Sequence, residues 1–208
     1  MSLLSYVRRH GYSDIARIYD KYDYKFYTGP YNLNIFGVRS ADKNIGQFND
    51  VLGIAYEDNK GHQVFLAQGT TDPGKHYAEN LSNQKGVAIL VPGQYRGAYV
   101  LGTHAKGKTT EHYALVQDRP VKVFRDRNRD NILDYDFNTI EEGVFGINIH
   151  RASKHQVLDD IGKWSAGCQV FKSIYDFQDF MSIVERGSNE YGNRFTYTLF
   201  EEEDFYYY

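Results

Sequence analysis

Alternating apolar and polar positions run through most of the chain after residue 31 and predict a series of strands. Residues 51–56 and 62–67 are apolar-rich runs joined by a polar segment that ends in Gly61. That arrangement is typical of a β-hairpin, because glycine adopts positive φ at little cost. Further runs of strand length lie at residues 87–91, 98–104, 114–117, 121–125, 144–150 and 194–200. The pattern therefore predicts a β-rich domain.

A helical pattern near the N-terminus interrupts this series. Apolar side chains at Ile15, Ile18 and Tyr22 follow one another at intervals of three and four, and Ser13 precedes them as a candidate N-cap. We interpret residues 1–30 as an N-terminal helical arm or docking helix. An integral part of the domain is the alternative.

A second helical pattern lies near the C-terminus. Ser173 is the expected N-cap and Gly187 the expected end. The apolar stripe between them consists of Ile174, Phe177, Phe180, Met181 and Val184. Residues 201–208 are first acidic and then aromatic, and we expect them to fray or to dock on a partner. The whole pattern predicts a β-rich α+β domain over residues 31–208 with one main C-terminal helix.

Composition fits one domain and excludes several classes of protein. The chain has 208 residues, of which 41% are hydrophobic and 25% charged, so it can bury a core. Its net charge of −3 argues against a general nucleic-acid partner. No apolar run approaches the roughly 18 residues of a membrane span, and the N-terminus lacks the pattern of a secretory signal peptide.

The single cysteine excludes an internal disulfide and any multi-cysteine metal site, but it is a candidate nucleophile. Cys168 follows Ser165, Ala166 and Gly167, small residues that let the backbone turn tightly, and His150 ends an apolar run. A nearby imidazole can accept the thiol proton, and free backbone N–H groups can bind an oxyanion. A structural core cysteine beside a hydrogen-bonded histidine is the alternative.

This segment resembles the catalytic segment of L,D-transpeptidases (YkuD-type domains). That family carries a histidine and, after a short intervening segment, Ser/Thr-His-Gly-Cys. Here 14 residues separate His150 from the sequence Ser-Ala-Gly-Cys that ends at Cys168. Gly-Thr-Thr-Asp-Pro-Gly at residues 69–74 is similar to an earlier turn of such domains, so the resemblance covers about residues 50–200. Ala166 and Val170 depart from the usual histidine and polar residue, and this form is similar to that of phage-encoded cell-wall enzymes.

The resemblance implies an L,D-transpeptidase-like fold, a mixed β-sandwich or barrel, and a role for each residue of the motif. Cys168 would be the nucleophile and His150 the general base. The backbone carbonyl of Arg151 would orient the imidazole. The N–H groups of Gly167 and Cys168 would bind the oxyanion, and Ser165 would support the loop.

The implied reaction is attack of the thiolate on a carbonyl of the peptidoglycan stem peptide, which gives a thioacyl-enzyme. Water would release the acyl group in an endopeptidase or carboxypeptidase, and an amine would release it in a transpeptidase. We expect hydrolysis, and we expect that catalysis requires no cofactor. His104, at a predicted strand end, and Trp164, beside the motif, are the expected substrate-binding residues.

Similarity to phage enzymes also implies where the protein acts. We expect synthesis in the host cytoplasm without a signal peptide, followed by release or association with the virion to act on the cell wall. Peptidoglycan is the expected partner, and residues 1–30 or the aromatic C-terminus are expected to contact other virion proteins. Two alternatives stay open: a virion attachment protein that keeps this fold without turnover, and a cysteine acyltransferase or peptidase with another substrate.

Two candidate metal sites also arise from the sequence. Residues 126–134 resemble the first nine positions of an EF-hand-like calcium loop, although the glutamate of position 12 is missing. The candidate ligands are Asp126, Asn128, Asp130 and Asp134. A polar turn between strands is the alternative interpretation. Candidate zinc ligands are His104, His112, His150 and His155, but none of these forms a short ligand pair with a carboxylate base.

Overall fold

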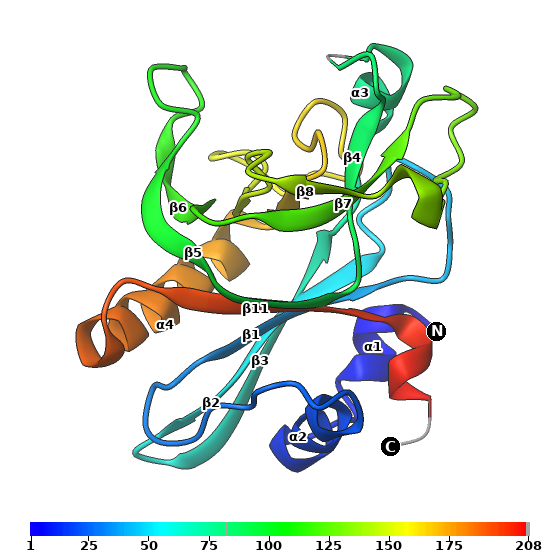
Figure 1. Ribbon diagram of the computed structural model, residues 1–208. Coiled ribbons are helices and arrows are strands. Elements are labelled where there is room, and N and C mark those ends of the chain that lie inside the picture. Colours follow the sequence, from blue (N-terminus) through cyan, green and yellow to red (C-terminus); the bar gives the residue numbers. More distant parts are fainter. Residues whose placement is uncertain (82, 207–208) are drawn as a thin grey trace.

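The computed structural model describes residues 1–81 and 83–206, and a closed eight-stranded β-barrel forms its centre (Figure 1). The order around the barrel is β1-β11-β5-β6-β9-β10-β3-β2. The pairs β1/β11 and β9/β10 are parallel, and the other pairs are antiparallel. The barrel strands are β1 (Asn34–Arg39), β2 (Asp50–Asp58), β3 (Gly61–Thr70), β5 (Gly93–His104), β6 (His112–Gln117), β9 (Ile149–Arg151), β10 (Gln169–Phe171) and β11 (Phe195–Glu201).

A small sheet and several helices surround the barrel. The sheet consists of β4 (Val87–Leu90), β7 (Val121–Asp126) and β8 (Glu141–Gly143), and it lies above the barrel in Figure 1. The helical elements are α1 (Leu3–Val7), α2 (Tyr12–Lys21), α3 (Lys75–Glu79), α4 (Ile174–Tyr191) and the 3₁₀ turns η1 (Phe137–Thr139) and η2 (Glu202–Phe205). The predicted β-rich α+β class with a main C-terminal helix is confirmed. None of the helices in the described ranges has the length and apolar character needed to cross a bilayer.

The predicted hairpin is formed by β2 and β3, in which Asp58 pairs with Gly61 across a two-residue turn. Gly61 has a φ of 104°, which is the reason for glycine at this position. The other predicted runs also overlap observed strands, but only the last two residues of the run 144–150 belong to one.

The prediction of a strand over residues 144–148 is wrong, and Gln117 supplies the physical reason. The N–H groups of Phe145 and Ile147 donate to Gln117 Oε1 at 3.0 and 2.9 Å. Gln117 N–H donates in turn to Asn148 Oδ1 at 2.9 Å. A side chain therefore satisfies the backbone groups that a neighbouring strand would otherwise pair with, and Gly146 turns the chain with a φ of 76°.

Helix α4 passes through Gly187 and ends at Tyr191, with Gly192 as its C-cap, so the predicted helix end is wrong. Ser173 caps the helix as predicted, since its Oγ accepts the Asp176 N–H at 3.3 Å. A Cβ at Gly187 would lie 2.8 Å from the Leu33 side chain. This glycine therefore allows close packing of α4 on the chain before β1 rather than ending the helix.

The N-terminal helices pack against the barrel in the manner of an integral part of the domain. They bury Val7, Ile15, Ile18 and Tyr19, which are at most 1% exposed. These residues belong to one apolar cluster with Leu3, Phe36, Val38, Val51, Ala55, Phe200 and Phe205. The packing favours the second of the two interpretations of residues 1–30.

The C-terminal segment folds back on α1 instead of fraying, as Figure 1 shows in the lower right. Phe205 is fully buried, and its carbonyl accepts hydrogen bonds from Tyr6 Oη at 3.1 Å and from His10 Nε2 at 3.0 Å. Phe205 is thus not available to a partner, contrary to the expectation for the aromatic C-terminus. Tyr207 and Tyr208 lie outside the described residues.

A buried ion pair joins the barrel to the small sheet. Arg39, at the end of β1, is 2% exposed, and its Nε lies 2.9 Å from Asp72 Oδ1. Its Nη1 donates to the Leu90 carbonyl of β4 at 2.9 Å, and its Nη2 to the Thr71 carbonyl at 3.1 Å. Asp50, at the start of β2, accepts from both the N–H and the hydroxyl of Thr71 at 2.6 and 2.9 Å.

Substitution of Arg39 by methionine is expected to lower the free energy of unfolding by about 3–5 kcal/mol, because it leaves buried carboxylates without their cation. The matched control is Lys75→Met, which breaks the exposed 3.7 Å pair of Lys75 with Glu79 and is expected to cost less than about 1 kcal/mol. Urea denaturation of both variants measures the difference. Equal costs would contradict a structural role of the buried pair.

Candidate active site

Cys168 and His150 line the same cavity, which has a volume of about 390 Å³. Parallel strands β9 and β10 bring the two residues together, since His150 of β9 pairs with Val170 of β10. Cys168 lies two positions before Val170, and residues two apart on an extended chain face the same side. Both expected substrate-binding residues, His104 and Trp164, line this cavity as well.

The orientation of the His150 imidazole is set by the backbone. Its Nδ1–H donates to the Arg151 carbonyl at 2.7 Å, so Nε2 is left as the acceptor nitrogen. Nε2 is buried and has no hydrogen-bond partner in the described structure. Burial, together with the neighbouring His104, lowers the pKa of His150 well below its usual value. The ring is therefore neutral and able to accept a proton at Nε2.

Two further histidines surround this ring. His104 stacks on His150 with ring centres 3.8 Å apart and planes inclined by 18°. His112, which pairs with His104 across β5 and β6, meets the edge of His150 at 5.8 Å. Burial lowers the pKa of His104 to about 4, so the stacked ring is also neutral. His104 thus contacts the candidate base directly, a contact that its position in the sequence does not reveal.

The Cys168 thiol is held by two backbone groups. Sγ–H donates to the Gly146 carbonyl at 3.3 Å, and Sγ accepts the Asn148 N–H at 3.5 Å. The residue is 9% exposed, and burial raises the pKa of the thiol to about 11. At neutral pH the site therefore holds a neutral thiol near a neutral imidazole rather than a preformed ion pair.

Ser165 organises the loop before the cysteine. Its fully buried hydroxyl donates to the Cys168 carbonyl at 2.9 Å and accepts the Gly167 N–H at 3.1 Å. The Gly74 N–H donates to the Ser165 carbonyl at 2.8 Å and ties this loop to the turn at residues 69–74. Because its N–H already has a partner, Gly167 is not free to bind an oxyanion in this structure, contrary to expectation. Cys168 N–H is the remaining candidate donor.

Gly167 is nevertheless required by the backbone. It has a φ of 121°, and a Cβ at this position would lie 2.1 Å from the Ala88 carbonyl oxygen of β4. Only a residue without a side chain allows this approach of the loop to the small sheet.

The lining of the cavity is cationic. It includes Lys108, Lys163 and Arg151, and no acidic side chain among the described residues. Trp164 adds a half-buried aromatic face. This lining favours a substrate that carries carboxylates.

Sequence reasoning missed Asn148, which connects the Cys168 thiol to His104, the ring that stacks on His150. Its side-chain amide donates to His104 Nδ1 at 3.0 Å, while its backbone N–H donates to Cys168 Sγ. Asn148 lies two positions before His150, and this spacing on one face of a strand is the signal that could have found it.

The candidate calcium ligands are engaged with one another. The Asn128 amide donates to Asp130 Oδ2 at 3.1 Å and to Asp134 Oδ2 at 2.8 Å, and Asp126 accepts the N–H groups of Asn128 and Asp134. Asn131 has the positive φ, 66°, expected of the sixth position. Within residues 1–81 and 83–206, no three His, Cys, Asp or Glu side chains are arranged to hold a metal ion. Calcium binding stays a prediction from the sequence.

Comparison of the chain with protein-family models, with curated proteins and with solved structures finds no match.

Substitution of Gly167 by alanine is expected to lower the free energy of unfolding by about 2 kcal/mol or more, since it combines an unfavourable φ with a backbone clash. Gly107→Ala is the matched control, because Gly107 has a φ of 79° but open space around its Cβ position. The control is expected to cost about 1 kcal/mol. Chemical denaturation measures both values, and a smaller cost for Gly167→Ala would contradict the close approach to Ala88.

The rate of Cys168 alkylation by iodoacetamide is expected to rise about tenfold per pH unit between pH 7 and 9. Only the thiolate reacts, and its fraction grows tenfold per unit below a pKa of about 11. Mass spectrometry of the single cysteine gives the rate directly. A rate that stays constant down to pH 5 would show instead a thiolate–imidazolium pair.

Proposed function

We propose that the chain is a cysteine-dependent enzyme that cleaves or exchanges peptide bonds in the stem peptides of peptidoglycan through a thioacyl-enzyme. On this proposal its fold is a variant of the L,D-transpeptidase domain. The protein is encoded by a phage and serves either lysis of the cell wall or entry through it. Hydrolysis is proposed ahead of transpeptidation.

One observation carries the proposal: the only cysteine and an imidazole with a free acceptor nitrogen share a cavity. The 2.7 Å hydrogen bond from His150 Nδ1 to the Arg151 carbonyl fixes the tautomer that general-base catalysis needs. An arbitrary pair of core residues has no need for an unpartnered, buried Nε2 beside an accessible cavity.

The proposed reaction begins when Cys168 Sγ attacks the stem-peptide carbonyl as its proton passes to His150 Nε2. The carbon–sulfur bond forms, and the carbonyl oxygen gains negative charge that Cys168 N–H would stabilise on this proposal. Collapse breaks the carbon–nitrogen bond, and the departing amine takes the proton from His150. Water or another amine then attacks the thioester and releases the thiol.

The charge of the cavity mouth supports an acidic acyl donor. Lys108 and Lys163 are exposed at this mouth and Arg151 lies deeper. Stem peptides carry free carboxylates, so the mouth would attract and orient them. Substitution of either lysine would then weaken substrate binding more than it slows the chemical step.

The test is incubation of the protein with purified stem-peptide-containing peptidoglycan fragments, followed by mass spectrometry of products and of the intact protein. The wild type is expected to release or join stem peptides and to carry a transient acyl adduct on Cys168. Cys168→Ala is expected to lose both, and His150→Gln to lower turnover by about 10² or more, because the proton acceptor is removed.

Melting curves of each variant provide the control for folding. If the wild-type protein is folded but forms neither product nor adduct, the proposal that it is an enzyme is refuted. The alternative, a protein that attaches to the wall without turnover, would then stand. Adducts formed only with other acyl donors would identify a cysteine acyltransferase or peptidase with another substrate.

A further inference from the structure

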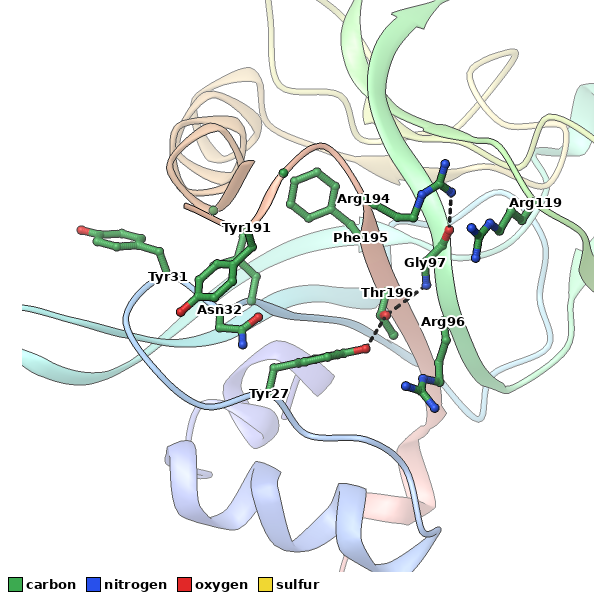
Figure 2. Close-up of a pocket in the computed structure, with 13 residues that line it drawn as sticks. Tyr27, Tyr31, Asn32, Arg96, Gly97, Arg119, Tyr191, Arg194, Phe195 and Thr196 are labelled. Atoms are coloured by element: carbon green, nitrogen blue, oxygen red, sulfur yellow. Dashed lines mark hydrogen bonds between the residues drawn. The ribbon is translucent and has the colours of Figure 1, made fainter. Parts of the chain in front are cut away.

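A second cleft, with a volume of about 610 Å³, lies apart from the cysteine cavity and shares no lining residue with it. It is bounded by the segment before β1, the C-terminal end of α4 and the adjoining ends of β5 and β11 (Figure 2). Figure 2 shows aromatic and amide side chains gathered on one side and arginines on the other. The polar and aromatic lining consists of Tyr27, Tyr31, Asn32, Arg96, Arg119, Tyr191, Arg194, Phe195 and Thr196.

The arginine side carries uncompensated positive charge. Of its three guanidinium groups, only that of Arg194 has an acidic partner, Asp118 at 2.9 Å. Arg96 and Arg119 are exposed, and their guanidinium groups make no hydrogen bond or ion pair within the described residues. Among residues 1–81 and 83–206, no acidic side chain lines the cleft. Two guanidinium groups are therefore available to a ligand.

A glycine brings these groups to the floor of the cleft. Gly97 has a φ of 59°, and a Cβ there would lie 3.2 Å from the Arg194 side chain and 3.5 Å from Arg119 Nη1. Its carbonyl accepts from Arg194 Nη1 at 2.8 Å, and its N–H donates to Thr196 Oγ1 at 3.1 Å. Hydrogen bonds thus fix the backbone at Gly97, while the guanidinium group of Arg119 has no protein partner among the described residues.

The opposite side supplies rigid aromatic rings. Tyr27 is held by the hydrogen bond between its hydroxyl and Thr196 Oγ1 at 3.1 Å, and Tyr31 by one from Arg186 at 2.8 Å. Tyr191, the last residue of α4, is 54% exposed, and its ring stands at the mouth (Figure 2). Such rings pack against flat, weakly polar ligand faces with little loss of conformational entropy.

We infer that this cleft binds an anionic glycan, with a sugar ring against the tyrosines and its carboxylate or phosphate on Arg96 and Arg119. Guanidinium groups pair with both anions in a bidentate manner, and the cleft volume suits one or two sugar rings. The inference rests on the proposed function in one respect, because the cell wall would supply the polymer. The cleft would then hold the polymer while the cysteine cavity acts on a stem peptide.

The test measures binding in a protein that cannot turn over, so that activity plays no part in it. Cys168→Ala protein is mixed with purified cell-wall sacculi, either untreated or stripped of phosphodiester-linked polymers, and sedimented at several concentrations. When Arg96→Ala and Arg119→Ala are combined with Cys168→Ala, binding to the sacculi is expected to weaken by roughly tenfold or more. Tyr191→Ala is expected to weaken it too, and Tyr191→Phe to leave it unchanged.

The matched control removes two positive charges elsewhere, with Lys60→Ala and Arg127→Ala in the same background, and is expected to bind like the parent. Loss of binding to stripped sacculi identifies phosphate as the anion, and retention identifies carboxylate. Equal loss in the control, no loss in the arginine variant, or equally tight binding of single-stranded DNA would overturn the inference. Arginine-dependent binding by a chain without peptidase activity would refute the proposed function alone.

Discussion

The ion pair between Arg39 and Asp72 is the interaction on which the rest of this structure depends. It buries a charge where the end of β1 meets the turn after β3, and the same guanidinium reaches the Leu90 carbonyl of β4. That turn continues to Gly74, which holds the Ser165 carbonyl of the cysteine loop. The position of Cys168 is thus coupled through a few hydrogen bonds to a charge inside the domain, where a missing partner is costly.

The candidate site is organised by backbone groups more than by charge. Carbonyls of Arg151 and Gly146 orient the imidazole and the thiol, and the Ser165 hydroxyl closes the loop between them. Burial keeps the thiol and the imidazole neutral, because the charged form of each loses more hydration than the neighbouring hydrogen bonds replace. Proton transfer during attack, rather than a standing ion pair, is the chemistry that such a site favours.

The distribution of charge matters more than its sum. The chain is net negative, yet Lys108, Lys163 and Arg151 line the cysteine cavity and three arginines line the second cleft, and no acidic residue among those described joins either lining. Cationic pockets on an acidic protein direct anionic ligands to particular places and discourage adsorption over the whole surface.

The sequence by itself determined the β-rich class, several of the strands, the hairpin at Gly61, the capped C-terminal helix and the pairing of Cys168 with His150 as candidates, since these follow from local spacing and residue chemistry. It misjudged Gly187 and residues 144–148, where a close helix contact and the Gln117 side chain override local preference. Only the tertiary structure decided that His104 stacks on His150, that Gly167 gives its N–H to Ser165, and that Arg96 and Arg119 face Tyr191 across a cleft. The histidine stack and the cleft join residues from separate strands and loops, so the closure of the barrel, not any local pattern, sets the distances between them.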